Sequence, residues 1–216
     1  MSLLTADEVQ QLAYQVWGAS FAISLLAGVL IHRGHFCTMG AISDWVVMHD
    51  ATRLRQWALA VAVGMAGFGL MAWLGWISPL STIYASSQLP WLSALLGGGM
   101  FGIGMVLASG CSSKSLVRLA AGNLKSLVVL LAMAVSALAA MRGLTAVWRV
   151  HGLDKVAIDL PHGPFVGQWL SALAGLELRA ALGVSAVLVS LCLLAWVVKD
   201  RRFHTPFNWV TGAGLG

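Results

Sequence analysis

Long apolar stretches with few charges constrain this chain more than any other feature of its sequence. Four of them, 56–77, 92–108, 124–148 and 178–198, meet or approach the roughly 20 residues that a helix needs to cross a bilayer. A fifth, 16–31, is shorter. With 59% hydrophobic and 10% charged residues, the chain is too apolar for a soluble domain of 216 residues. We therefore predict an all-α fold, a polytopic membrane helix bundle forming one membrane domain over residues 1–216.

The basic residues gather at the ends of these stretches, which indicates orientation in a membrane and gives no reason to expect nucleic-acid binding. The positive-inside rule places the ends marked by Arg53, Lys125 and Lys199 in the cytoplasm and the N-terminus outside. Asp7 and Glu8 stand where a cleavable signal would have its basic region. The first apolar stretch is therefore expected to stay in the protein.

Two short segments, 36–51 and 112–122, are too polar to cross the membrane but keep helical spacing of their apolar positions. Each begins beside a cysteine, Cys37 or Cys111, and Ser112 or Ser113 is a suitable N-cap for the second. The order long helix, glycine, cysteine, short helix, long helix thus occurs twice. We predict a pseudo-repeated bundle with short re-entrant or discontinuous helices, an arrangement that marks transport sites near the bilayer midplane.

Both cysteines lie where a helix N-terminus would present unpaired N–H groups and a partial positive charge, which favour anions. Arg33, Lys114 and Arg118 add positive charge nearby, although each could instead anchor the chain at the cytoplasmic surface. Structural packing and contact with a solute are both open for the two thiols. Cys192 lies inside an unbroken apolar run and is left out of the site.

Other features allow more than one interpretation. Asp44 on a short membrane helix requires a partner such as Arg33 or Lys114, or else has a cation or proton role. The glycines of 92–110 serve either helix packing or a channel wall. Residues 150–175 are expected to form an outside loop with a half-dipping piece, and their histidines lack metal-ligand spacing. We expect no metal and no cofactor.

The pattern Arg33-Gly34-x-Phe36-Cys37-x-x-Gly40-Ala41, followed by Ser109-Gly110-Cys111-Ser112 after a glycine-rich helix, resembles the YeeE/YedE sulfur-transport family over about residues 28–202. The resemblance implies a multi-pass protein of the bacterial inner membrane that takes up thiosulfate or a related sulfur-containing anion. It also implies a substrate-binding set of Cys37, Cys111, Gly34, Gly110, Ser112, Lys114 and Arg33.

From these residues we hypothesise a transporter, not an enzyme, that passes the anion along neutral cysteine thiols. One alternative is a membrane sulfurtransferase that forms a cysteine persulfide. Another is a non-transporting subunit of a two-part sulfur or selenium transporter. Larger family members carry a further cysteine motif that is absent here, and residues 203–216 look like the start of another membrane helix. The chain could then be the N-terminal part of a two-half transporter, partnered by a second half or by a soluble sulfur-carrier protein.

Overall fold

A computed structural model describes residues 6–79, 87–161, 163–175, 177–200 and 203–216. Over these residues the chain is almost entirely helical, which confirms the predicted all-α class. The elements in chain order are α1 (Ala6–Arg33), α2 (Thr38–Met48), α3 (Thr52–Trp73), β1 (Gln88–Leu89), α4 (Trp91–Leu107), α5 (Ser112–Ala120), α6 (Leu124–Arg142), α7 (Leu144–His151), η2 (Leu153–Lys155), β2 (Ile158–Asp159), α8 (Val166–Ala174), α9 (Leu178–Val198) and α10 (Pro206–Leu215).

Five helical stretches of the described chain are long and apolar enough to cross a membrane. They are Asp7–Met48, Thr52–Trp73, Trp91–Ala120, Leu124–Arg142 and Leu178–Val198. The five stretches predicted from hydropathy are therefore helical, and the chain is a multi-pass membrane protein. The first helix is longer than the predicted 16–31. The polar segment over residues 6–15 contains no proline or other helix breaker, so it forms the first turns of the same helix.

The predicted single helix over 124–148 is wrong at its C-terminal end, because α6 ends at Arg142. Gly143 takes an extended conformation and serves as both the C-cap of α6 and the N-cap of α7. The carbonyl oxygen of Ala139 accepts two hydrogen bonds at the end of α6, from the N–H of Gly143 at 2.9 Å and from the Thr145 hydroxyl at 2.5 Å. The segment predicted as one crossing is thus a long helix followed by a short one.

The predicted loop over 150–175 contains more regular structure than its sequence indicates. It holds η2, the strand β2 and the helix α8, which packs against α9. Strands β1 and β2 pair antiparallel, with Gln88 opposite Asp159 and Leu89 opposite Ile158. This short pairing ties the chain before α4 to the chain after α7.

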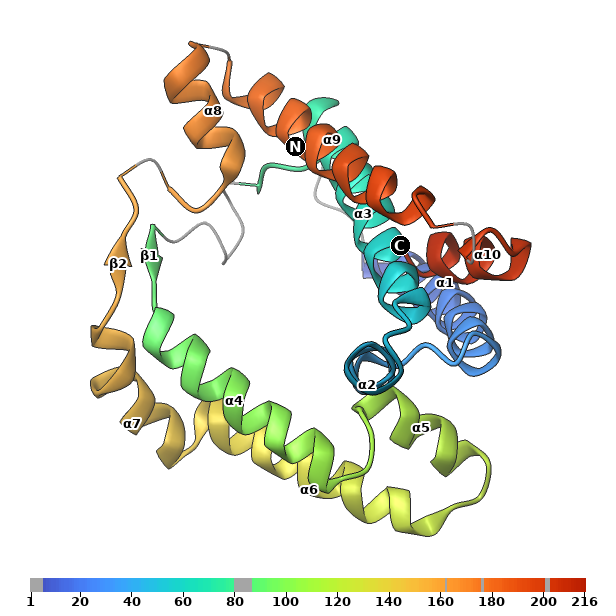
Figure 1. Cartoon of the computed structure of the whole chain (residues 1–216). Helices are drawn as coiled ribbons and strands as arrows, with labels where there is room; N and C mark the ends of the chain where they lie inside the picture. The colour runs from blue at the N-terminus through green and yellow to red at the C-terminus, as the bar shows by residue number, and fades with distance from the viewer. Residues whose placement is uncertain (1–5, 80–86, 162, 176, 201–202) are drawn as a thin grey trace.

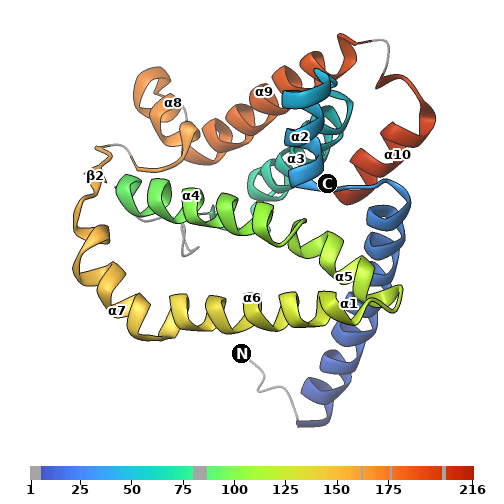
Figure 2. The ribbon, with the colours of Figure 1, turned by 60° about the horizontal axis from the view of Figure 1, so that its bottom comes forward.

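The helices form two groups that meet at α2 and α5 (Figure 1). In one group α3 packs along α9, α10 packs on α3, and α1 packs on α10. The other group contains α4, α6 and α7; α4 and α6 overlap in Figure 1 but separate in Figure 2. Helix α2 packs against α3, whereas α5 packs against α6 and touches α1. The two short helices therefore lie where the groups join.

A buried cluster of Leu59, Val197 and Phe203 forms the core of the first group, with Trp209 packed edge-on against Phe203. Arg55 at the start of α3 pairs with Asp200, just after the end of α9. The start of α3, which carries Arg53, and the end of α9, next to Lys199, therefore lie on the same side of the bundle. The positive-inside rule requires the same arrangement. The predicted helix after residue 203 is α10, which the core holds in place.

Gly69 of α3 and the glycines of α4 have opposite surroundings. A Cβ atom on Gly69 would lie 2.5 Å from the Cβ of Ala186 on α9, so this glycine allows close approach of the two helices. In α4, by contrast, a Cβ on Gly97, Gly98, Gly99, Gly102 or Gly104 would meet nothing within 4 Å. Within the described chain, the glycines of α4 do not serve helix packing.

The replacement Gly69→Leu should destabilise the α3–α9 pair, because a side chain there must force the helices apart. We expect a loss of about 1–3 kcal/mol, the usual cost of overpacking. Gly67→Leu is the matched control, since Gly67 lies on the same helix with nothing within 4 Å of its Cβ position. Thermal unfolding of the two variants in detergent micelles measures the difference. Equal melting temperatures would show that α3 and α9 do not approach closely at Gly69.

Candidate functional site

The two helix breaks have the same backbone geometry. His35 after α1 and Ser109 after α4 both adopt left-handed conformations, with φ of 47° and 56°. In each case the next residue donates its N–H to a carbonyl five residues back, Phe36 to Ile31 at 3.2 Å and Gly110 to Met105 at 3.1 Å. This is the Schellman pattern of helix termination. The cysteine that follows is then the N-cap of the short helix, so the predicted pseudo-repeat is present in the backbone.

The glycines of the two motifs have a packing role at these breaks. Gly34 is buried, and a Cβ on it would lie 2.8 Å from Cγ2 of Thr211 on α10. Gly110 is also buried, and its Cβ would lie 3.2 Å from the Lys114 side chain. The left-handed residues are the neighbours His35 and Ser109, not the glycines.

The two breaks bring Cys37 and Cys111 into contact. Their Sγ atoms lie 3.3 Å apart, so that one thiol donates a weak hydrogen bond to the other. Both side chains are buried, with 8% and 6% of their surface exposed. The N–H of Gly40 also donates to Cys37 Sγ at 3.5 Å. The expectation that Ser112 or Ser113 caps α5 is wrong, because the extended residue at the N-cap is Cys111 and the helix begins at Ser112.

A pocket of about 240 Å³ opens beside Cys37 and is rich in basic side chains. Its lining comes from the end of α1 and the loop after it, from α2, α3 and α5: Ile31, His32, His35, Phe36, Cys37, Gly40, Arg53, Lys114, Val117 and Arg118. The described residues that line it include no carboxylate. Lysine and arginine donors beside two helix N-termini have the chemistry that attracts an anion.

Arg53 is a basic pocket residue that the sequence did not place in the site, and His32 and His35 also line the pocket without having been predicted there. Its Nε atom lies 3.3 Å from a carboxylate oxygen of Asp44, which orients the guanidinium from α3 toward α2. Gly40 leaves room for it, because a Cβ there would lie 2.9 Å from Arg53 Nη1. The predicted partners of Asp44, Arg33 and Lys114, are replaced by Arg53. The clue in the sequence is the glycine at Gly40, whose missing side chain admits a neighbour.

On the α5 side of the pocket, Lys114 and Arg118 lie one helical turn apart. Arg118 Nη1 donates to the carbonyl oxygen of Ser109 at 3.3 Å, which ties α5 back to the break that precedes it. On the α2 side, the ring of Phe36 stacks on Trp57 with ring centres 4.7 Å apart. These contacts hold the two cysteine-bearing loops to the helices around them.

The predicted site residues fall into three groups. Cys37 and Lys114 line the pocket, and Cys111 contacts Cys37 behind it. Gly34 and Gly110 pack beneath the two loops. Arg33 and Ser112 are exposed and do not line the pocket.

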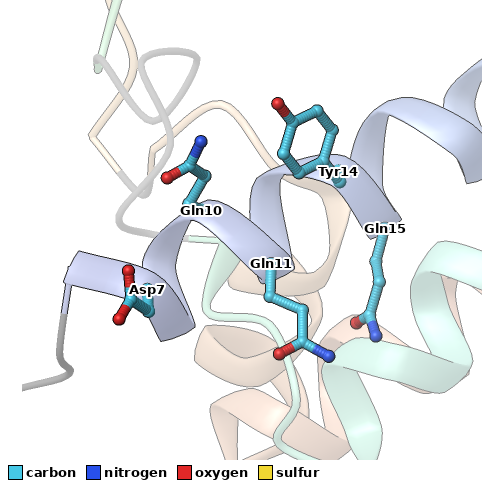
Figure 3. Close-up of a pocket in the computed structure, with 5 residues that line it drawn as sticks. All are labelled: Asp7, Gln10, Gln11, Tyr14 and Gln15. Atoms are coloured by element: carbon cyan, nitrogen blue, oxygen red, sulfur yellow. The ribbon is translucent and has the colours of Figure 1, made fainter.

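Two features outside this pocket carry no comparable chemistry. Cys192 is exposed on α9. A hollow of about 500 Å³ on α1 is lined by Asp7, Gln10, Gln11, Tyr14 and Gln15. Figure 3 shows that all five come from one helix, and they include neither a thiol nor a basic side chain.

The fold and the pocket define a multi-pass membrane protein with a basic pocket beside a pair of buried thiols, where two helices break. Residues 33–213 match the sequence model of the family described as sulphur transport. The chain therefore belongs to the YeeE/YedE sulphur-transport family.

Two curated relatives, both called thiosulfate transporter TsuA, are similar to this chain. The protein of Escherichia coli strain K12 is 32% identical over 105 residues, which cover 49% of this chain and 28% of that protein. The protein of Spirochaeta thermophila is 25% identical over 200 residues, which cover 90% of this chain and 58% of that protein. The chain thus spans little more than half the length of the Spirochaeta thermophila protein and a smaller share of the Escherichia coli protein.

The positive pocket should make Cys37 react faster with an anionic thiol reagent than with a cationic one of the same size. We expect the double change Arg53→Gln and Lys114→Gln to lower this rate ratio by about tenfold, since focused charge raises local anion concentration by that order or more. Methanethiosulfonates of opposite charge, with labelling followed by peptide mass spectrometry, measure the ratio. The unmodified chain, labelled in parallel with both reagents, gives the reference ratio. An unchanged ratio at Cys37 would contradict an electropositive pocket.

Proposed function

We propose that this chain conducts thiosulfate, or a closely related sulfur-containing anion, across the bacterial inner membrane and is not an enzyme. Family membership and the names of the two relatives support the substrate class. The observation that carries the proposal is the contact of Cys37 with Cys111 at the edge of a pocket lined by Arg53, Lys114 and Arg118. We further propose that the anion passes from one thiol to the other.

The basic side chains and the thiols have separate tasks in this proposal. Thiosulfate is a dianion with a soft terminal sulfur, and each charge-assisted hydrogen bond to it is worth about 1.5–3 kcal/mol. Arg53 and Lys114 therefore draw the anion to the pocket. The thiols hold the terminal sulfur as neutral S–H donors, because a thiolate would repel a dianion strongly at low dielectric. Weak, adjacent sites allow the ion to leave as well as enter.

The present contact between the sulfurs is a closed state of the path. With 3.3 Å between the Sγ atoms, no anion fits between them. For the anion to pass, the hydrogen bond between the two thiols must break, and each thiol must bond to the substrate instead. Both kinds of bond are weak, so the exchange changes the free energy of the site little. The two sulfurs can separate because each lies in a loop between helices, not within a helix.

The membrane arrangement and partners complete the proposal. We place the N-terminus outside and the ends at Arg53, Lys125 and Lys199 in the cytoplasm. The open glycine face of α4 supports a second transporter half that packs there, since a Cβ on Gly98 or Gly102 meets nothing within 4 Å in the described chain. A soluble sulfur-carrier protein would receive the anion inside the cell.

Replacing Cys111 with alanine should lower thiosulfate uptake by at least about fivefold, the effect of losing one hydrogen bond of about 1 kcal/mol from the path. Uptake of radiolabelled thiosulfate into vesicles containing the purified full chain measures this. Cys192→Ala is the matched control and should transport normally, because Cys192 is exposed on α9. Normal uptake by Cys111→Ala would remove the thiol relay. Absence of uptake by the unmodified chain would favour the non-transporting subunit.

Replacing Gly40 with alanine should also lower uptake, by about tenfold, because it displaces the Arg53 guanidinium and loses charge-assisted bonds. The same change raises intrinsic helix stability by about 0.5–1 kcal/mol, so loss of α2 would not explain the result. Gly67→Ala on α3 is the control, with open space at its Cβ. If both variants transport equally, Arg53 has no part in binding the anion.

The sulfurtransferase alternative is favoured by the same buried thiol beside an anion pocket. In that case a thiolate attacks the terminal sulfur of thiosulfate, expels sulfite and keeps one sulfur atom as a persulfide. The intact mass of the protein after exposure to thiosulfate separates the two. A stable added sulfur on Cys37 or Cys111 favours the enzyme, and an unmodified chain favours transport.

A further inference from the structure

The Cys37–Cys111 pair has a second chemical capacity, which the transport of thiosulfate does not use. Two thiols in contact, held by segments far apart in the chain, are positioned to form a disulfide. Their sulfurs lie 3.3 Å apart, so bonding at the usual length of about 2.05 Å requires them to approach by about 1.2 Å. Both lie at N-cap positions in loops, where a small rotation of either side chain covers that distance.

We propose that Cys37 and Cys111 form a reversible disulfide that closes the anion path, and that a polythionate dianion such as tetrathionate is the oxidant that forms it. This inference rests on the proposed transport function. A disulfide joins α2 to α5 covalently, and the path between the thiols can no longer open. The pair would then stop uptake when the oxidised form of the transported anion accumulates.

The pocket selects the oxidant by charge and by access. Both thiols are buried, and Cys37 is the one that lines the basic pocket, whereas Cys111 lies behind it. An oxidant therefore reaches Cys37 first. A dianion with sulfonate ends suits the lining of Arg53, Lys114 and Arg118 in the same way as thiosulfate. A neutral oxidant gains nothing from these charges.

The reaction balances with the two thiols and one tetrathionate. Cys37 reacts in the fraction of molecules in which it has lost its proton to water, and it attacks a central sulfur of tetrathionate, which carries no formal charge because the charges lie on the two sulfonate ends. This step releases one thiosulfate and leaves an S–SO₃⁻ group on Cys37 Sγ. Cys111 then attacks Cys37 Sγ, breaks that S–S bond and releases a second thiosulfate. The two thiols are oxidised to a disulfide, the tetrathionate is reduced to two thiosulfates, and two protons pass to water. Both released ions are the anion that the path already accommodates.

The test uses the full chain with Cys192→Ser, which removes the exposed thiol from the reaction. After treatment with tetrathionate, we expect an intact mass lower by two hydrogens and a peptide pair linked through Cys37 and Cys111. Thiosulfate uptake into vesicles should fall to the level of protein-free vesicles. Dithiothreitol should restore both the mass and the uptake. In the same background, Cys111→Ser should keep the S–SO₃⁻ adduct on Cys37 without any linked peptide.

Two results would overturn the inference. One is a stable adduct on Cys37 beside a free Cys111, and the other is full uptake by protein in which the linked peptide is complete. The two proposals fail in different ways. A chain that links Cys37 to Cys111 but never transports contradicts the proposed function. A chain that transports before treatment and forms no link contradicts the disulfide alone.

Discussion

The contact between Cys37 and Cys111 is the interaction on which the rest of the site depends. Two long helices, α1 and α4, must end in the same way for it to exist. Left-handed residues at His35 and Ser109 turn the chain, and the next short helix then starts at the thiol. The N-termini of α2 and α5 consequently meet at one point. The partial positive charges of these N-termini and the neighbouring cations add there, so the two sulfurs lie among positive charges.

The charges around the pocket must attract the proposed anion and also allow it to leave. Arg53 provides charge that an anion can bind, yet Asp44 pairs with the same guanidinium at 3.3 Å and offsets part of its charge. A pocket of unpaired cations would hold a dianion too tightly for rapid passage. The sulfur contacts are weak for the same reason. Asp44 thus has Arg53 as its partner, and in the proposed transport path it would orient the guanidinium and reduce the attraction of Arg53 for the anion.

The sequence predicted the long helices and the paired breaks, but it did not predict the neighbours of the thiols. Hydropathy identifies a membrane helix because the bilayer requires a minimum apolar length. It does not locate the break at Gly143, since a single glycine is tolerated within a helix. The two-residue strands that pair Gln88 with Asp159 are too short to show a period. Arg53 was placed only as a helix end, because its approach to Gly40 depends on how α2 packs on α3.

Selenosulfate can be used to locate the bound anion in the protein, because it has selenium in place of the terminal sulfur that the thiols are proposed to hold. Crystals of the full chain soaked with this ion would reveal the selenium by anomalous scattering. A peak beside Cys37 Sγ, within reach of Arg53 and Lys114, is the expected result. Selenium bound elsewhere, with the pocket beside Cys37 unlabelled at saturating ion, would contradict the thiol-lined path.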